Sequence, residues 1–198
     1  MTPSRTSPRF VLLDQSLTGF VGHHYAYARP LLAAAREAGF RPVLAAHRRL
    51  GELGPDFPEV EVHRPFRHTT YCRHTYDADH RPGIATRLVR ALRVRSFAAG
   101  CAELFRELPL EEGDVVFAAT MSELDFAGLS RWLAAEPASR RASWHVQFHL
   151  NVFRGREGDY AKQEPLTAKV RGVLAAAVAP LGGHRLRLHC TTEALVRQ

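Results

Sequence analysis

The chain has 198 residues, of which 45% are hydrophobic and 24% charged, a composition that excludes an intrinsically disordered protein and indicates a packed globular one. Its formal net charge is +7, and Lys162 and Lys169 are the only lysines, so nearly all of the positive charge is arginine. We therefore expect an affinity for anions such as nucleotides, phosphates, acidic lipid headgroups or nucleic acid.

The cysteines and apolar segments indicate the compartment. Cys72, Cys101 and Cys190 are odd in number and show no paired spacing, which argues against a disulfide framework and favours a reducing compartment. The first ten residues lack the apolar core of a signal peptide, and no apolar run approaches the ~20 residues of a membrane span. We expect a cytoplasmic protein with no transmembrane segment, folded as one domain over residues 1–198.

The first half of the chain predicts three strands and two helices. The strands are expected at 10–14, 41–47 and 60–66. Between the first two strands we expect a helix that ends at Gly39 and buries one stripe, formed by Tyr27, Leu31, Ala34 and Ala38. Pro30 falls inside this pattern, where it either kinks the helix or moves its regular part downstream.

A long helix is predicted from Ile84 to Leu108. Its apolar residues recur at steps of three or four, which predicts that this stripe lies on the sheet: Leu88, Ala91, Val94, Ala98, Cys101, Phe105 and Leu108. Arg87, Arg90 and Arg93 lie off the stripe and are expected on an arginine-rich outer face.

The second half repeats the alternation of strands and helices. Strands are expected at 114–120, 143–150 and 186–192, and helices around 126–133 and over 165–179. The last six residues, "EALVRQ", resemble a helix cut short. Together the elements predict an α/β fold, a Rossmann-like three-layer domain with a mostly parallel sheet.

Ligands of open α/β sheets bind outside the carboxyl ends of the strands, so the residues directly after each strand are the informative ones. After the first strand, Gly19 and Gly22 precede a helix whose amino end would favour an anion, and His23 and His24 follow at that positive end. This loop lacks both the complete dinucleotide fingerprint and the lysine of a P-loop, so an ordinary turn is the alternative interpretation.

Three further loops are expected at the same edge. Glu123 and Asp125 follow the 114–120 strand and either line an acceptor pocket or cap the next helix from Ser122. His149 lies at the carboxyl end of the 143–150 strand, whose polar face also carries His145; either histidine could instead belong to an exposed sheet edge. Asp14, Glu123 and His149 are the residue types that could act as a general base.

The segment 63–83, "HRPFRHTTYCRHTYDADHRPG", is the most unusual part of the chain. Cysteine and histidines occur here at spacings that match no common zinc pattern, so we predict no metal site. We expect a basic loop over the cleft in which Arg67, Tyr71 and Arg73 contact an anionic or sugar acceptor. A solvated loop, or a contact with single-stranded nucleic acid, is the alternative.

Three stretches resemble the N-terminal half of a family-four-like glycosyltransferase of the GT-B fold: "LLDQSLTGFVGHHYAYARPLLAAAREAGFRPVLAAHR", "DVVFAATMSELDFAGLSRWL" and "WHVQFHLNVF". The resemblance implies two Rossmann-like domains that face each other across a cleft and transfer a sugar from a nucleotide-sugar donor without a bound metal or other cofactor. It also implies that the loop from Gly19 to His23, with His24 beside it, approaches the donor phosphates, and that His149 contacts the transferred sugar.

In that family the second domain supplies most nucleotide contacts, and a 198-residue chain has room for only one such half. We therefore expect the acceptor-side half of an enzyme, not catalytically competent alone, that requires a missing C-terminal domain or a partner subunit. Its acceptor would be a glycan, a lipid or a small molecule, and His149 and Glu123 are the candidate catalytic residues. The alternative function is a noncatalytic α/β binding module that uses its arginine-rich face for a partner or, less favoured, for nucleic acid.

Overall fold

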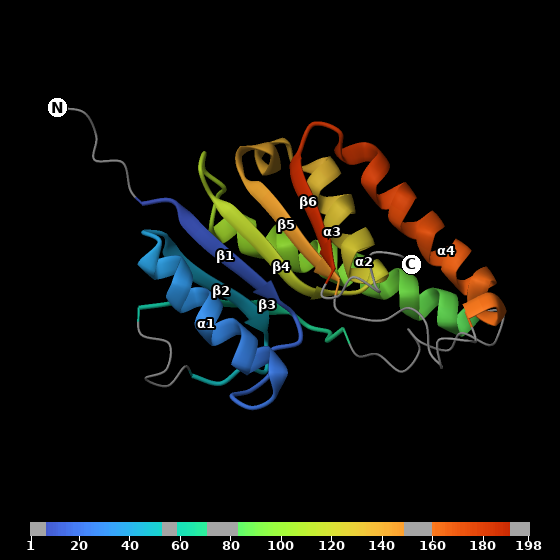
Figure 1. The fold of residues 1–198 in the computed structure, drawn as a ribbon, viewed down its shortest axis with the longest axis horizontal. Helices are drawn as coiled ribbons and strands as arrows, with labels where there is room; N and C mark the ends of the chain where they lie inside the picture. The colour runs from blue at the N-terminus through green and yellow to red at the C-terminus, as the bar shows by residue number, and fades with distance from the viewer. Residues whose placement is uncertain (1–6, 53–58, 71–82, 149–159, 191–198) are drawn as a thin grey trace.

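A computed structural model of the chain describes residues 7–52, 59–70, 83–148 and 160–190, without the side chains of 160–167 and 169 (Figure 1). The strands are β1 (Arg9–Asp14), β2 (Arg41–His47), β3 (Glu61–Phe66), β4 (Val115–Met121), β5 (Ser143–Phe148) and β6 (Arg185–Cys190). The helices are α1 (His23–Glu37), α2 (Ile84–Glu107), α3 (Glu123–Ala135) and α4 (Tyr160–Val178), with short 3-10 helices at Pro137–Arg141 (η2) and Ala179–Leu181 (η4).

The six strands form one sheet in the order β3-β2-β1-β4-β5-β6, and every neighbouring pair is parallel. The chain moves from β1 outward to β2 and β3, then crosses back to the other side of β1 to begin β4. The predicted α/β, Rossmann-like fold is confirmed. The strand order reverses between β1 and β4, and this reversal places the expected ligand crevice at the carboxyl ends of these two strands.

Alternating strand residues build two apolar clusters, one on each face of the sheet. α2, α3 and α4 cover one face, whose central strand residues are fully buried: Val11, Leu13, Val116, Ala118, Trp144 and Val146. On the other face, α1 packs Ala28 and Leu32 against Leu12 and Leu44. Figure 1 shows α1 over β1 and β2, while the other three helices lie behind the sheet.

The predicted contact stripe of α1 is wrong by one residue. The buried positions of α1 are His24, Ala28, Leu32 and Ala35, whereas Tyr27 is partly exposed at the side of the helix that faces β4. Pro30 lies within the helix, on its exposed side. The shift matters for function because it turns His24 inward, beneath the first turn.

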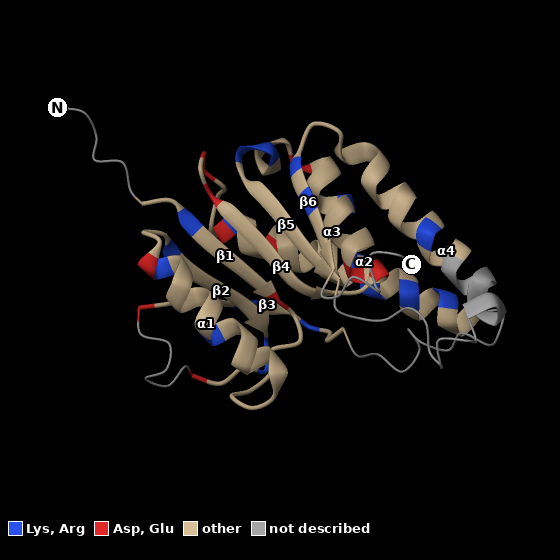
Figure 2. Ribbon diagram, viewed as in Figure 1, with Lys and Arg blue, Asp and Glu red and all other residues tan. Residues whose placement is uncertain are grey.

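The arginine-rich outer face predicted for α2 is partly wrong. Arg93 is buried, and its guanidinium forms an ion pair with Asp125 of α3, with Nε 3.2 Å from Oδ1. The apolar stripe holds in the second half of the helix, where Cys101 and Phe105 are buried, but Leu88 in the first half is 59% exposed. Because of this ion pair, acidic residues at the start of α3 lie beside basic residues of α2 (Figure 2).

α2 and α3 approach each other closely at Gly128. A Cβ atom at this position would lie 2.7 Å from the backbone oxygen of Val94 and 2.8 Å from Cβ of Phe97, so only glycine fits. This contact fixes the start of α3 against the middle of α2, which brings Asp125 within reach of Arg93. Among the described helices, none is long and apolar enough to cross a membrane.

A buried ion pair ties the amino ends of β1 and β4 together. The backbone N–H of Arg9 donates to Oδ1 of Asp114 at 3.0 Å, and its side-chain Nε contacts both carboxylate oxygens. Glu111 N–H donates to Oδ2 at 2.9 Å. Burial alone would raise the pKa of Asp114, but the hydrogen bonds from Arg9 and Glu111 outweigh it and lower the pKa below its ordinary value.

This pair predicts a loss of stability in acid. Because the pKa of Asp114 is lowered by folding, its contribution to stability is present above the unfolded-state pKa of about 4 and is lost as the pH falls through the lower folded-state pKa. Urea unfolding between neutral and acid pH measures the effect. Asp114→Asn should flatten the acid part of the curve, and an unchanged acid dependence in this variant would contradict the prediction.

Candidate functional site

The loop after β1 is held by a buried carboxylate. Oδ1 of Asp14 accepts a hydrogen bond from Ser16 N–H at 3.0 Å, and Oδ2 accepts one from Nδ1 of His24 at 3.0 Å. Both Asp14 and His24 are buried. His24, which the sequence placed among the phosphate-binding residues, thus joins the first turn of α1 to the end of β1 and sets the position of the loop between them.

Gly22 begins α1 in a conformation that favours glycine. Its φ is 85°, no side chain caps the helix, and the first turn carries no acidic residue. A Cβ atom at Gly19 or at Gly22 would meet nothing within 4 Å, so there is room for a ligand to approach the backbone closely. Gly19 is partly exposed, and Gly22 and His23 are exposed, beside the positive end of the helix.

The end of β4 carries backbone strain, and a helix cap follows it. Thr120 has φ of 54°, a left-handed conformation that costs a β-branched residue roughly 1–3 kcal/mol and that concentrates at functional sites. Ser122 then caps α3, since its Oγ accepts from Asp125 N–H at 3.2 Å and Asp125 in turn accepts from Ser122 N–H at 3.3 Å. The capping interpretation of Asp125 is confirmed.

A buried polar network connects the loops after β1, β3 and β4. Oδ2 of Asp125 accepts from Nε2 of Gln15 and from Oγ1 of Thr70, each at 3.1 Å. Thr70 Oγ1 also lies 2.9 Å from the backbone oxygen of Thr120, and Thr70 N–H donates to Oγ of Ser16 at 2.8 Å. With Arg93 on its other side, Asp125 is the centre of this network. The network joins the segments that follow β1 and β3 to the end of β4 and the start of α3, at the position where the strand order predicts a ligand crevice.

Gln15 leaves one polar atom of this network unsatisfied. Its side chain is fully buried, its Nε2 donates within the network, and its Oε1 has no hydrogen-bond partner among the described residues. A buried amide oxygen without a partner is uncommon and marks a place where a donor from a ligand or a water would be stabilised. Gln15 directly follows β1, at the strand-order reversal.

Glu123 is the titratable residue of this edge with the clearest chemical signature. It is the first residue of α3 and is half-buried. Burial raises its pKa above the ordinary value, and the nearby charge of Asp125 raises it further, against the opposing effects of its own backbone N–H, Arg90 and Arg93. A carboxylate with a raised pKa is a better proton acceptor near neutral pH than an ordinary one.

The structure brings together only part of the predicted site. The carboxyl edge carries Gly19 and Gly22 in the connection from β1 to α1, His23 at the start of α1, and Glu123 at the start of α3. α1 and α3 cover opposite faces of the sheet. Arg67 follows β3 at the same edge and is exposed. His149, Tyr71 and Arg73 lie outside the described residues.

The predicted basic loop over 63–83 is shorter than expected, because residues 63–66 belong to β3. Within its described remainder, His68 Nδ1 lies 2.9 Å from Ser96 Oγ of α2, while Cys72, His74 and His80 fall outside the described part.

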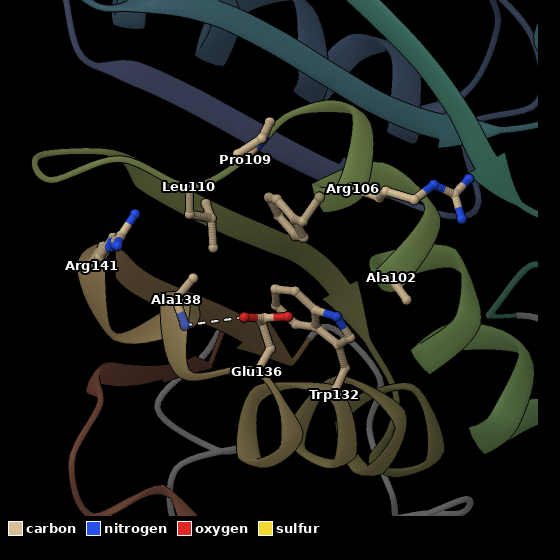
Figure 3. Close-up of a pocket in the computed structure, with 9 residues that line it drawn as sticks. Ala102, Arg106, Pro109, Leu110, Trp132, Glu136, Ala138 and Arg141 are labelled. Carbon is tan, nitrogen blue, oxygen red and sulfur yellow. Dashed lines mark hydrogen bonds between the residues drawn. The ribbon is translucent and has the colours of Figure 1, made fainter.

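Cavities of several hundred Å³ lie at the opposite edge of the sheet, where the strands begin. One of them, of about 300 Å³, lies at the amino end of β4 (Figure 3), and its lining residues include Phe105, Leu110, Trp132 and Glu136. Oε1 of Glu136 accepts a hydrogen bond from Ala138 N–H there, at 3.2 Å. A second cavity of about 410 Å³ lies near the start of β2. None of the predicted site residues lines either cavity, so both are separate from the carboxyl-edge site.

Sequence reasoning missed the residues that organise this edge: Gln15, Thr70, Arg93 and Thr120. The position of Gln15 and Thr120 at strand ends was the available signal. No protein-family model matches the chain, and no curated protein and no solved structure is significantly similar to it.

Proposed function

We propose that this chain is the acceptor-side, Rossmann-like half of a glycosyltransferase that moves a sugar from a nucleotide-sugar donor to an acceptor hydroxyl. The observation that carries the proposal is the pairing of two features at the strand-order reversal. One is the glycine loop that leads from β1 into the positive end of α1. The other is the half-buried carboxylate of Glu123 at the end of β4, with its raised pKa.

The glycine loop would hold the donor diphosphate. Gly22 allows the backbone to come close to a phosphate, and the amino end of α1 stabilises the negative charge that develops on the diphosphate as it leaves. Asp14 and His24 support this role indirectly because they fix the loop from below. The strained backbone at Thr120, near the end of β4, supports a functional role for the carboxyl edge of the sheet.

Glu123 would act as the general base on the acceptor side. As the acceptor oxygen forms its bond to the anomeric carbon, the bond from that carbon to the diphosphate breaks, and the hydroxyl proton passes to the Glu123 carboxylate. The role of His149 in positioning the sugar remains a prediction from the resemblance.

The alternative function, a noncatalytic binding module, relies on a face formed by Arg87, Arg90 and Arg93. Arg93 does not belong to this face, because it is buried and paired with Asp125. The remaining exposed arginines of α2 carry no arrangement that favours a particular partner.

The first test is donor binding to this chain, with two glycine variants as a matched pair. Gly22→Val and Gly39→Val change the same residue type at nearly the same backbone angle, φ of 85° and 86°, at opposite ends of α1. Saturation-transfer NMR with a panel of nucleotide diphosphate sugars should give signals for the native chain and Gly39→Val and lose them for Gly22→Val. If no donor binds the native chain, or if both variants bind equally, the proposed site is wrong.

A further inference from the structure

The face of β4, β5 and β6 that lies on the same side as α1 has no helix over it within the described part of the chain. α1 contacts β1 and β2, and the other helices pack on the opposite face. Figure 1 shows β5 and β6 open toward the viewer. This is unusual, because parallel sheets normally have both faces covered. The exposed half of the sheet therefore offers a ready position for one more layer.

The side chains of this open face form three rows set by strand register. The middle row pairs Phe117, His145 and Arg187 across β4, β5 and β6. The row toward the carboxyl end places Gln147 beside His189, and the row toward the amino end places Ser143 beside Arg185. Nδ1 of His145 lies 3.0 Å from Nε2 of His189, and the two rings are stacked with their centroids 5.2 Å apart. One ring nitrogen donates and the other accepts in this contact.

The open face carries positive charge from two arginines, one of them already paired. Among the described residues, the guanidinium of Arg187 makes no hydrogen bond or ion pair. Burial lowers the pKa of His145, and the charges of His189 and Arg187 lower it further. Arg185 lies at the amino end of the face and is already paired with Glu112 at 3.0 Å.

The border with α1 is aromatic. From α1, Tyr27 faces the open surface, and its hydroxyl donates to Oε1 of Gln147 at 2.5 Å. The rings of Tyr27 and Phe117 have centroids 6.4 Å apart. β4 contributes no charged side chain to this face. The titratable and charged groups here are therefore Tyr27, His145, His189, Arg185 and Arg187, with Glu112 beside Arg185.

We propose that the open face of β4, β5 and β6 is a docking surface for an acidic helix of a protein partner. The helix would complete the missing layer, setting carboxylates opposite Arg187 and the His145–His189 pair and an apolar side chain against Phe117. The charge argues against a second copy of this chain as the occupant, because an isologous contact would bring like charges together. Nucleic acid is disfavoured because the face offers a single unpaired arginine for phosphate contacts.

Docking of a carboxylate here would be coupled to proton uptake. A carboxylate opposite His145 favours the protonated form of its ring and opposes the lowering of its pKa, so the affinity should rise as the pH falls. This surface is independent of the proposed carboxyl-edge site, and its failure would leave the glycosyltransferase proposal unaffected.

The test uses the full chain and three probes. The first is a designed helical peptide with glutamates along one face and leucines beside them, the second is the same peptide with lysine for each glutamate, and the third is a single-stranded DNA oligonucleotide. NMR titration should give chemical-shift changes with the acidic peptide at residues 143–148 and 185–190 and at both histidine rings. Neither the lysine peptide nor the oligonucleotide should bind there.

Two variants make the test specific. Arg187→Glu should weaken the acidic peptide by about tenfold or more, whereas the same change at Arg131, exposed on α3, should leave the affinity unchanged. The double variant His145→Gln/His189→Gln should remove the gain in affinity between about pH 7.5 and about pH 5.5. The proposal is overturned if the acidic peptide does not shift these residues, if the Arg187 variant binds it equally, or if the oligonucleotide binds this face instead.

Discussion

Replacing Asp125 with alanine is expected to lower the free energy of unfolding by about 3–5 kcal/mol, because it removes the partner of a buried charge. Asp125 and Arg93 are only 2% and 4% exposed. Without the carboxylate, the buried guanidinium of Arg93 would lose its ion pair with Asp125, and Gln15 and Thr70 would each lose an acceptor. Helix α3 would also lose half of its capping box. Urea unfolding at neutral pH measures the loss.

Two further variants separate the buried pair from an ordinary ion pair. Glu112→Ala removes the partner of Arg185 in an exposed ion pair and should cost at most about 1 kcal/mol. Asp125→Ala combined with Arg93→Met should cost clearly less than the sum of the two single changes, since the double variant leaves no unpaired buried charge. A loss below about 1 kcal/mol for Asp125→Ala would show that Asp125 does not hold this edge together.

The sequence predicts the sheet well because buried parallel strands are short apolar runs. β2 has the predicted bounds, and β1, β4, β5 and β6 each begin within one residue of the predicted start. The cap at Ser122 and Asp125 was predictable for a similar reason, since it depends on residues only three apart. Such local patterns need no knowledge of how the chain returns on itself.

The polar network of the site could not be predicted in this way. Gln15 and Asp125 are 110 residues apart, and only the strand order brings their side chains within hydrogen-bonding distance. Arg93 was assigned to the surface because periodicity treats a charged residue in a helix as solvent-facing. Its burial depends on a partner from another helix, and the close approach at Gly128 that positions this partner is equally invisible in the pattern of α2.

Replacing Glu123 with glutamine is expected to lower the transfer rate by roughly 10²–10⁴-fold in the two-domain enzyme that the proposed function requires, since glutamine cannot accept the acceptor proton. In the native enzyme the rate should fall as the pH drops through the raised pKa of Glu123, because the protonated carboxyl is not a base. The variant should lack this acid limb. Donor binding should be little changed, because Glu123 lies on the β4 side of the crevice, away from the glycine loop.

The same substitution gives a stability readout that separates a functional role from a structural one. Folding raises the pKa of Glu123, so its ionised form destabilises the folded state, and the associated stability is present in acid and lost as the pH rises through the raised pKa. Glu123→Gln should therefore unfold at the same or a higher urea concentration at neutral pH while losing activity. Glu136→Gln, at the opposite edge of the sheet (Figure 3), should retain activity. An active Glu123→Gln enzyme would mean that Glu123 is not the base, and that its pKa reflects only burial beside Asp125.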